Sequence, residues 1–404
     1  SGQTVIVAAH SRVLQNQILA TLEDLSEDIL DFSAVLLKGR NNYISLEALD
    51  NELDADSPEA STALALAIIC GWVAQTPTGD WEDLRTWAIE THVPELRQLR
   101  WKLRVESPPG PALSRLDELD FYRRALDGIN TADIAVFNHA LLVSRSDWMG
   151  SVSHVVVDEA HNLEDSATDA LSEEVEDESL LTLCDSIWDP SRRRGTVRRL
   201  ADATKWSMRD PRLVTLRQAV DDVRSAVRDL GDPLIDYLRD RTGAQRDDAA
   251  KYGMSYRVRR GVDTSRPAYQ ATVRAGRSLR GALIDVADAL NGIALPEQLH
   301  GRYRRNRLEG EMARVGRAAR GASELVDSIL WAVDEEQWIN IASLRVVEGV
   351  WHWSIRRAPI SVAPQLRDVW GSLDTAVLTS ATLSVGDSFS HLISRLGLDS
   401  AQAT

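Results

Sequence analysis

Val155-Val156-Val157-Asp158-Glu159-Ala160-His161 is the stretch that decides the fold. Three consecutive β-branched apolar residues are typical of a strand that is buried on both faces, as strands of parallel sheets are. Open α/β sheets bind their ligands at the carboxyl ends of the strands, and this end carries two successive carboxylates. The stretch therefore predicts an α/β domain with a ligand site directly after this strand.

The two carboxylates suit the chemistry of a nucleoside triphosphate. Asp158 can hold a hydrated Mg²⁺, an ion that takes a few carboxylates together with substrate phosphates. Glu159 can orient and deprotonate the water that attacks a γ-phosphate, and His161 stands where it could sense that reaction. A lone Asp-Glu pair is often only an acidic strand end that faces solvent. Three valines followed by Asp-Glu-Ala-His form a much narrower pattern, which favours a nucleoside triphosphatase.

A second apolar strand, within residues 375–383, delivers the hydroxyls of Thr379, Ser380 and Thr382 to its carboxyl end. Such hydroxyls can hydrogen-bond the two carboxylates and the region of the γ-phosphate. The alternative is an ordinary polar strand end.

Two further strands end in polar residues before a helix begins. After the apolar run 4–9, Ser11 and Arg12 open an amphipathic helix, and a phosphate can bind to amides at such a turn. The run 131–142 carries Asn138 and His139 at the corresponding place. Any strand-to-helix turn has polar residues, and a lone His is more often structural than catalytic.

The charge of the chain is unevenly distributed. Residues 191–320 hold 29 of the 46 basic side chains but only 16 of the 61 acidic ones, a net charge of +13 that leaves −28 on the rest. Such asymmetry indicates a polyanionic partner, which the total of −15 conceals. Attraction between oppositely charged domains, or solvated helix faces, would give the same pattern.

The basic region is predicted to be largely helical. From about 166 to 340, apolar residues recur at helical spacing, interrupted by a Gly- and Arg-rich region at 241–281. There, rings and guanidiniums alternate as they do on surfaces that bind single strands. Residues 344–355 alternate and predict a hairpin that returns to the sheet. The interleaved residues are Tyr252, Tyr256, Arg257, Arg259 and Arg260, with Arg302, Tyr303, Arg304, Arg305 and Arg307 repeating the pattern.

Two cysteines, Cys70 and Cys184, are too few and too distant for a disulfide framework or a metal site. Each is expected to be a buried apolar residue in a reducing cytosol. No apolar run is long enough to span a membrane. The chain begins at Ser1 without an initiator Met or a basic-then-apolar leader, so we expect no signal peptide and a fragment cut inside a domain.

The stretch 36–46 offers two cations, Lys38 and Arg40, and a ring at Tyr43 that could stack on a base. On chemistry alone, an ordinary polar turn into a helix is the better interpretation.

These motifs, in this order, resemble those of the XPD/DinG family of superfamily-2 DNA helicases. Asp158-Glu159-Ala160-His161 is similar to the DEAH form of the Walker B box, and Ser380-Ala381-Thr382 to motif III. His10–Arg12 resembles element Ia. The run 132–142 resembles the family's Asn-His element, which implies that Asn138 and His139 lie near the site and contact DNA or neighbouring motifs. Lys38-Gly39-Arg40-Asn41-Asn42-Tyr43-Ile44-Ser45 resembles the family motif that supplies the first cysteine ligand of a [4Fe-4S] cluster. Ser45 stands at the cysteine position, so we expect no iron–sulfur cluster.

The resemblance implies an α/β fold in which a partial RecA-like motor domain is interrupted by a small cluster-less insert and by a helical Arch domain. The implied motor segments are 1–35 (with motif Ia), 129–168 (with the Walker B box) and 343–404 (with motif III). The insert would cover 36–128 and the Arch domain 169–342. Packing of Trp72, Trp81, Trp87 and Trp101 is expected to replace the cluster in the insert.

The resemblance also implies an activity: ATP-dependent translocation, 5′ to 3′, on single-stranded or forked DNA or on R-loops, in a cytoplasmic repair or replication protein. ATP and Mg²⁺ would be its cofactors, with Asp158 on the metal and Glu159 and His161 in catalysis. Thr379, Ser380 and Thr382 would couple hydrolysis to movement. The expected DNA contacts are Ser11, Arg12, Arg40, Tyr43, Asn138, His139, Arg257, Arg259 and Arg260.

No Gly-x-Gly-Lys-Ser/Thr loop occurs in the 404 residues, and no second motor domain follows, so the chain would be the middle of a helicase. Two other interpretations stay open. One is a non-catalytic nucleic-acid-binding or scaffolding protein, and the other is the helicase part of a CRISPR effector or nuclease fusion. The sequence names no protein partner.

Overall fold

The computed structural model describes residues 4–28, 31–53, 60–85, 88–105, 115–144, 152–191, 193–243, 253–296, 302–331, 334–347, 349–384 and 388–399. The chain divides into two compact units, which are residues 1–171 with 361–404, and residues 172–360. The first unit contains both the Asp-Glu pair and Ser380. Each unit is described by itself below.

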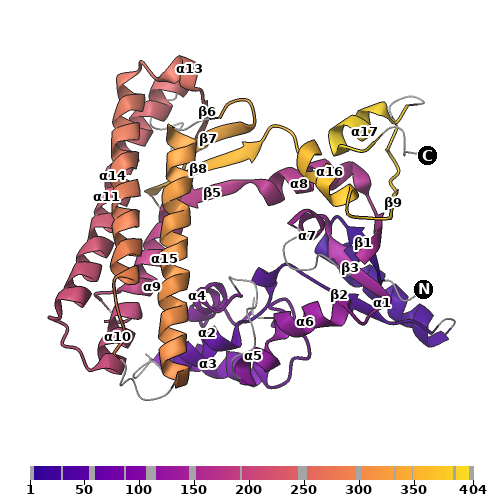
Figure 1. The fold of residues 1–404 in the computed structure, drawn as a ribbon, viewed down its shortest axis with the longest axis horizontal. Helices are drawn as coiled ribbons and strands as arrows, with labels where there is room; N and C mark the ends of the chain where they lie inside the picture. The colour runs from indigo at the N-terminus through magenta and orange to yellow at the C-terminus, as the bar shows by residue number, and fades with distance from the viewer. Residues whose placement is uncertain are drawn as a thin grey trace. The chain divides into compact units, whose positions relative to one another are not determined.

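Five described strands form a fully parallel sheet in the first unit (Figure 1). Because the carboxyl ends of parallel strands share one edge, the turns after β1, β3, β4 and β9 meet there. The predicted α/β class is confirmed, and the sheet is consistent with a RecA-like fold. The strand order is β2 (Ala34–Leu36), β3 (Ile134–Asn138), β1 (Thr4–Ala9), β4 (Val152–Val157) and β9 (Thr375–Leu378).

Strand β4 is not equally buried on its two faces. Val155 and Val157 are 1% and 0% exposed, whereas Val156 is only half-buried. Ile6 in β1 and Phe137 in β3 are fully buried beside them. The valine run therefore anchors one face of the sheet in the core, and its prediction as a strand buried on both faces is correct for one face only.

The strands of this sheet lead into helices across short turns. Strand β1 precedes α1 (Arg12–Asp28), β3 precedes α7 (His139–Ser144), and β4 continues through η2 (Ala160–Asn162) into α8 (Leu163–Leu171). The helices α16 (Ala363–Trp370) and α17 (Ser390–Leu396) stand before and after β9 in the chain. Within the described residues, no helix combines the length and the apolar character needed to cross a bilayer.

The insert between β2 and β3 is held by a short backbone ladder. Ile44 donates its amide to the Gly79 carbonyl at 2.9 Å, and Trp81 donates to Asn42 at 2.8 Å. On the other side, Val105 donates to Tyr43 at 3.1 Å. The insert's helices are η1 (Arg40–Asn42), α2 (Leu46–Leu53), α3 (Ala60–Val73), α4 (Glu95–Lys102), α5 (Arg115–Leu119) and α6 (Phe121–Ile129).

The tryptophans of the insert contribute unequally to its core. Trp81 is 2% exposed and stacks on Trp72 with the ring centroids 5.2 Å apart. Trp101 is 53% exposed, so its expected role in the packing is wrong. Trp87 lies outside the described residues.

The second unit is built around long helices whose apolar faces form one core. The region 241–281 was expected to interrupt the helices, but its last part, from 267 on, belongs to α14. Helix α14 packs closely on α15, since a Cβ added at Gly276 would meet the Leu330 side chain at 2.5 Å. The helices are α9 (Asp177–Ile187), α10 (Thr196–Thr204), α11 (Pro211–Thr242), α13 (Arg260–Asp263), α14 (Pro267–Asn291) and α15 (Arg302–Leu330).

A four-stranded antiparallel sheet of the described residues packs in the same unit. The predicted hairpin is present as β7–β8, but its return to the parallel sheet is wrong. Leu344, Trp353 and Ile355 pack into the helical core of the second unit instead. Trp353 Nε1 also donates to the Val227 carbonyl at 3.1 Å. The order is β5 (Glu173–Glu176), β8 (Val350–Pro359), β7 (Trp338–Val347) and β6 (Met254–Val258), so this unit extends to 360 rather than 342.

The two cysteines should differ sharply in reactivity. Cys184 is 2% exposed, and burial raises the pKa of its thiol to about 12. At pH 8 only roughly one such thiol in ten thousand is ionised. Cys70 is half-buried. We expect iodoacetamide to modify Cys70 in the native protein and Cys184 only after denaturation, as peptide mass spectrometry would detect. Equal labelling rates in the native protein would contradict this placement.

Candidate functional site

The Asp-Glu pair lies in a tight turn at the carboxyl edge of the parallel sheet. The Asp158 amide donates to the Ala8 carbonyl of β1 at 2.8 Å, which extends the strand pairing by one residue. Glu159 then adopts the left-handed region with φ 50° and ψ 46°. This conformation is uncommon for a residue with a side chain and is often found at functional sites. After this turn, the Ala160 amide donates to the Thr379 carbonyl at 3.0 Å.

Three side chains from two strand ends meet at this turn. Ser380 Oγ lies 3.3 Å from Glu159 Oε2 and 2.6 Å from His161 Nδ1. His161 Nδ1 lies 3.2 Å from the same carboxylate oxygen. Because a hydroxyl carries one hydrogen, Ser380 can donate to Glu159 while it accepts from a protonated Nδ1 of His161. Glu159 and His161 are 39% and 40% exposed, so solvent and substrate can reach them.

The other hydroxyls predicted for coupling lie further from the acids. Thr379 meets the turn through its backbone, donating its amide to the Val157 carbonyl at 2.9 Å. The Thr382 amide lies 3.4 Å from Ser380 Oγ, and the Thr382 side chain is exposed. Ser380 therefore contacts Glu159 through its side chain, whereas Thr379 contacts Val157 and Ala160, on either side of the acids, through its backbone.

Asn138 and His139 support the fold of the site. Asn138 Oδ1 accepts the Leu141 amide at 2.7 Å and so caps α7. His139 is 0% exposed, and its Nε2 donates to the Asp158 carbonyl at 2.8 Å. Burial lowers the pKa of His139, which keeps the ring neutral. Of the two contacts expected for His139, with DNA or with a neighbouring motif, the enclosed ring makes the second and not the first. Its contact is to the neighbouring acid turn.

Ser11 and Arg12 lie at the same edge of the sheet, where β1 ends. Ser11 Oγ accepts the Leu14 amide at 3.3 Å, as a residue that caps α1 does. Arg12 has a side chain that is 54% exposed, and its Nη1 lies 2.8 Å from Glu82 Oε1 in the insert. The Arg12 guanidinium is thus accessible to a ligand but already has a carboxylate partner.

The predicted stacking of Tyr43 on a base is also wrong. It is 4% exposed, its hydroxyl accepts the Lys38 amide at 3.1 Å, and its ring packs on Tyr122. A ring so enclosed cannot stack on a base in this conformation. Arg40, in η1, is half-buried.

The predicted basic residues of the second unit lie on and after β6. Arg257 and Arg259 are exposed, whereas Tyr256 is half-buried and packs edge-on against Tyr237. Alternation along the strand therefore separates the ring from the guanidinium that the sequence pattern had grouped together. The Arg260 side chain and Tyr252 lie outside the described residues.

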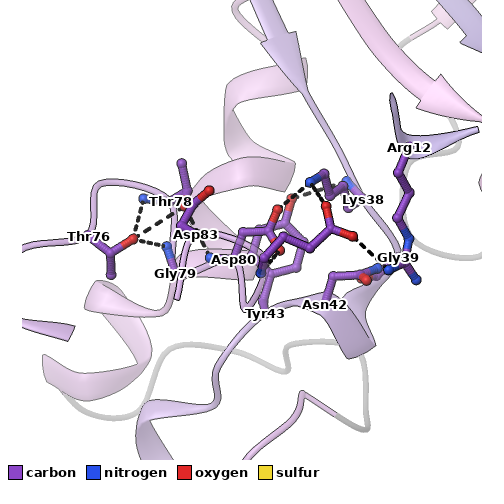
Figure 2. A network of polar contacts seen from close by, with 11 residues as sticks. Arg12, Lys38, Gly39, Asn42, Tyr43, Thr76, Thr78, Gly79, Asp80 and Asp83 are labelled. Atoms are coloured by element: carbon purple, nitrogen blue, oxygen red, sulfur yellow. Dashed lines mark hydrogen bonds and ion pairs between the residues drawn. The ribbon is translucent and has the colours of Figure 1, made fainter. Parts of the chain in front are cut away.

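The sequence did not reveal a buried ion cluster that joins α1 to the insert (Figure 2). Lys38, 3% exposed, places its Nζ 2.5 Å from Asp80 Oδ2 and 2.7 Å from Glu82 Oε2. These partners are more than forty residues apart in the chain, and no local pattern could have paired them.

The acid turn fits a magnesium ion that brings its own phosphate ligands. In the described residues, the Asp158 carboxylate has no hydrogen-bond or ion-pair partner, so it is available to a cation. The same residues contain no cluster of three His, Cys, Asp or Glu side chains that could hold a metal. Mg²⁺ does not require one, since it usually keeps several waters and binds one or two carboxylates plus substrate phosphates.

Comparison with known proteins shows that the chain is DinG-like over part of its length. It is 27% identical over 178 residues to a protein of Bacillus subtilis called 3′-5′ exonuclease DinG, a match that covers 42% of this chain and 18% of that protein. It is 25% identical over 181 residues to the protein of the same name in Staphylococcus epidermidis, and 25% identical over 190 residues to that in Staphylococcus aureus. The chain spans less than a fifth of the length of these relatives. No protein-family model matches it.

Proposed function

We propose that this DinG-like chain is part of an ATP-dependent DNA helicase that moves 5′ to 3′ along single-stranded DNA. One observation carries the proposal: Ser380, after β9, lies 3.3 Å from Glu159, in the turn after β4. An acid placed to activate water thereby contacts a second strand end that can respond to the reaction. The proposed setting is cytoplasmic DNA repair or replication, at forks or R-loops.

In this mechanism Glu159 takes a proton from the attacking water as its oxygen bonds to the γ-phosphorus, and the bond to the bridging oxygen breaks to release ADP. Asp158 would hold Mg²⁺, which supplies neutralising charge to the phosphates when it is bound. Ser380 and His161 orient the Glu159 carboxylate. When Glu159 becomes protonated, its hydrogen bond from Ser380 and its charge contact with His161 change, and the segment after β9 passes this change to the DNA.

The DNA contacts are proposed at two places. Ser11 and Arg12 would bind backbone phosphates near the nucleotide site, as residues at a helix start can. Arg257 and Arg259 would bind a strand on the second unit, which we propose to be an Arch domain. Their exposure and positive charge support this role.

Strand separation by the full-length protein tests the proposal. With ATP and Mg²⁺, we expect it to unwind a duplex that carries a 5′ single-stranded tail and to leave a duplex with a 3′ tail intact. Failure on both substrates would reject the helicase assignment, and unwinding of only the 3′-tailed duplex would reject the polarity. The 404 residues alone should hydrolyse ATP poorly, because they contain no phosphate-binding Gly-Lys-Ser/Thr loop.

A nuclease in the same polypeptide is the second candidate, because the similar proteins are called 3′-5′ exonucleases. Degradation of labelled single-stranded DNA from its 3′ end, without ATP, would support it. A scaffold without catalytic activity would instead bind DNA and turn over no ATP, whereas the helicase subunit of a CRISPR effector would keep ATP turnover.

The protein is also proposed to lack an iron–sulfur cluster. Ser45 Oγ accepts the Ala48 amide at 3.1 Å and caps α2, and a cluster needs about four cysteines. We expect protein purified without oxygen to be colourless, with no bound iron by elemental analysis. Stoichiometric iron with the visible absorption of a cluster would contradict this expectation.

A further inference from the structure

Glu82 is shared by two cations of very different accessibility. Its Oε2 accepts from Lys38 Nζ at 2.7 Å, and its Oε1 accepts from Arg12 Nη1 at 2.8 Å. Figure 2 shows this network: Asp80 lies beside Lys38, and Arg12 lies at one end of the chain of polar contacts. The Lys38 side chain is 4% exposed and that of Arg12 is 54% exposed. Lys38 is therefore a buried part of the insert, whereas the Arg12 guanidinium is exposed enough to separate from Glu82.

The charges of this cluster balance only while Arg12 is present. Burial opposes the charge on Lys38, but hydrogen bonds to Asp80 and Glu82 keep its pKa above the ordinary value of 10.5. Partial burial also opposes the charge on Glu82, yet hydrogen bonds from Lys38 and Arg12 hold its pKa below 4.5. At neutral pH two cations thus face two carboxylates. If Arg12 leaves, a net negative charge remains on a partly buried group, which draws the guanidinium back.

The Arg12–Glu82 pair is poorly suited to holding the fold together. Ion pairs with this degree of exposure contribute little to stability. Lys38 keeps Asp80 as a partner at 2.5 Å if the Glu82 charge is removed. A guanidinium binds a carboxylate and a phosphate through the same N–H donors, so the two ligands compete. Arg12 also begins α1 shortly after β1 ends, and β1 pairs with β4, which leads into the acid turn.

From this geometry we propose that Glu82 competes with DNA phosphate for Arg12: the insert holds the guanidinium until a strand displaces it. This inference rests on the proposed DNA contact of Arg12 and adds a residue that weakens it. The energy of an exposed pair limits the effect to about threefold in affinity.

The test measures the dissociation constant of the full-length protein for a fluorescent oligothymidine, without nucleotide, over a series of salt concentrations. Glu82→Gln should bind about threefold more tightly than the wild type. The slope of its log affinity against log salt should stay close to that of the wild type, because the strand displaces Glu82 in the wild type and the same phosphates are neutralised in both complexes. In an Arg12→Ala background the same Glu82→Gln change should have no effect.

Asp83→Asn is the matched control, because it removes the same charge one residue away, where the carboxylate accepts from the Thr78 hydroxyl. It should bind DNA as the wild type does. Equal affinities of Glu82→Gln and Asp83→Asn would overturn the inference, as would a gain that persists without Arg12. Glu82→Asp, which keeps the charge on a shorter side chain, should give an intermediate gain if Glu82→Gln proves unstable. If the wild type binds no DNA, the proposed function itself fails.

Discussion

Glu159→Gln in the full-length protein should lower the rate of DNA-stimulated ATP hydrolysis by about 10²- to 10⁴-fold, the usual contribution of a general base. The amide has the same shape as the carboxylate and can still accept from Ser380, which lies 3.3 Å from Oε2 in the native turn. It cannot take a proton from water. We therefore expect KM for ATP to change little while kcat falls, as steady-state kinetics at saturating single-stranded DNA would measure.

Glu164→Gln is the control for this substitution. Glu164 lies five residues further along, in α8, and pairs with Arg395 rather than with the acid turn. Glu164→Gln removes one negative charge, as Glu159→Gln does, but ATP turnover should stay near that of the wild type. If the Glu159→Gln variant keeps more than about a tenth of the wild-type rate, Glu159 is not the general base.

Gly79→Ala should lower the free energy of unfolding by about 2 to 4 kcal/mol, because two costs coincide. Gly79 has φ +67°, which side chains disfavour, and an added Cβ would overlap the ring of Phe121. Its carbonyl also accepts the Ile44 amide in the ladder that holds the insert together. Urea denaturation followed by tryptophan fluorescence would measure the change, since Trp72 and Trp81 stack beside this ladder.

Gly71→Ala serves as the comparison. Gly71 lies in α3, where nothing stands within 4 Å of an added Cβ. Alanine favours helix by up to about 1 kcal/mol relative to glycine, so this variant should be as stable as the wild type or slightly more so. If both variants unfold at the same urea concentration, the account of the Gly79 turn is wrong.

Four of the five described strands of the parallel sheet could be predicted, because they are short apolar runs that end in polar residues; β2 (Ala34–Leu36) was not identified from the sequence. In the second sheet, only the β7–β8 hairpin could be predicted. Strand β5 reads Glu-Glu-Val-Glu, and β6 places Tyr256 and Arg257 in an Arg-rich stretch, so neither carries a strong local signal. Their strand conformation depends on pairing with β8 and β7, far along the chain. Non-local pairing of this kind overrides local pattern.

At the candidate site, the sequence identified residue types that suit the chemistry but not their exposure. The order of the motifs predicted that Ser380 would meet Glu159, and their distance agrees. It did not predict that Tyr43 and His139 are enclosed, because a ring that could contact DNA looks the same in sequence as one that fills a core. Nor could it pair Lys38 with Asp80 or Arg12 with Glu82, since only the folded insert brings these residues together.

The central claim is that Asp158 and Glu159 face the last phosphate of a bound nucleotide at the edge of the parallel sheet. Phosphate release from ATP by the full-length protein, followed as single-stranded DNA is added in the presence of Mg²⁺, tests it most directly. The account predicts turnover that rises with DNA to a plateau and is lost in both Asp158→Asn and Glu159→Gln. Turnover that is absent in the wild type, or equal in all three proteins, would contradict it.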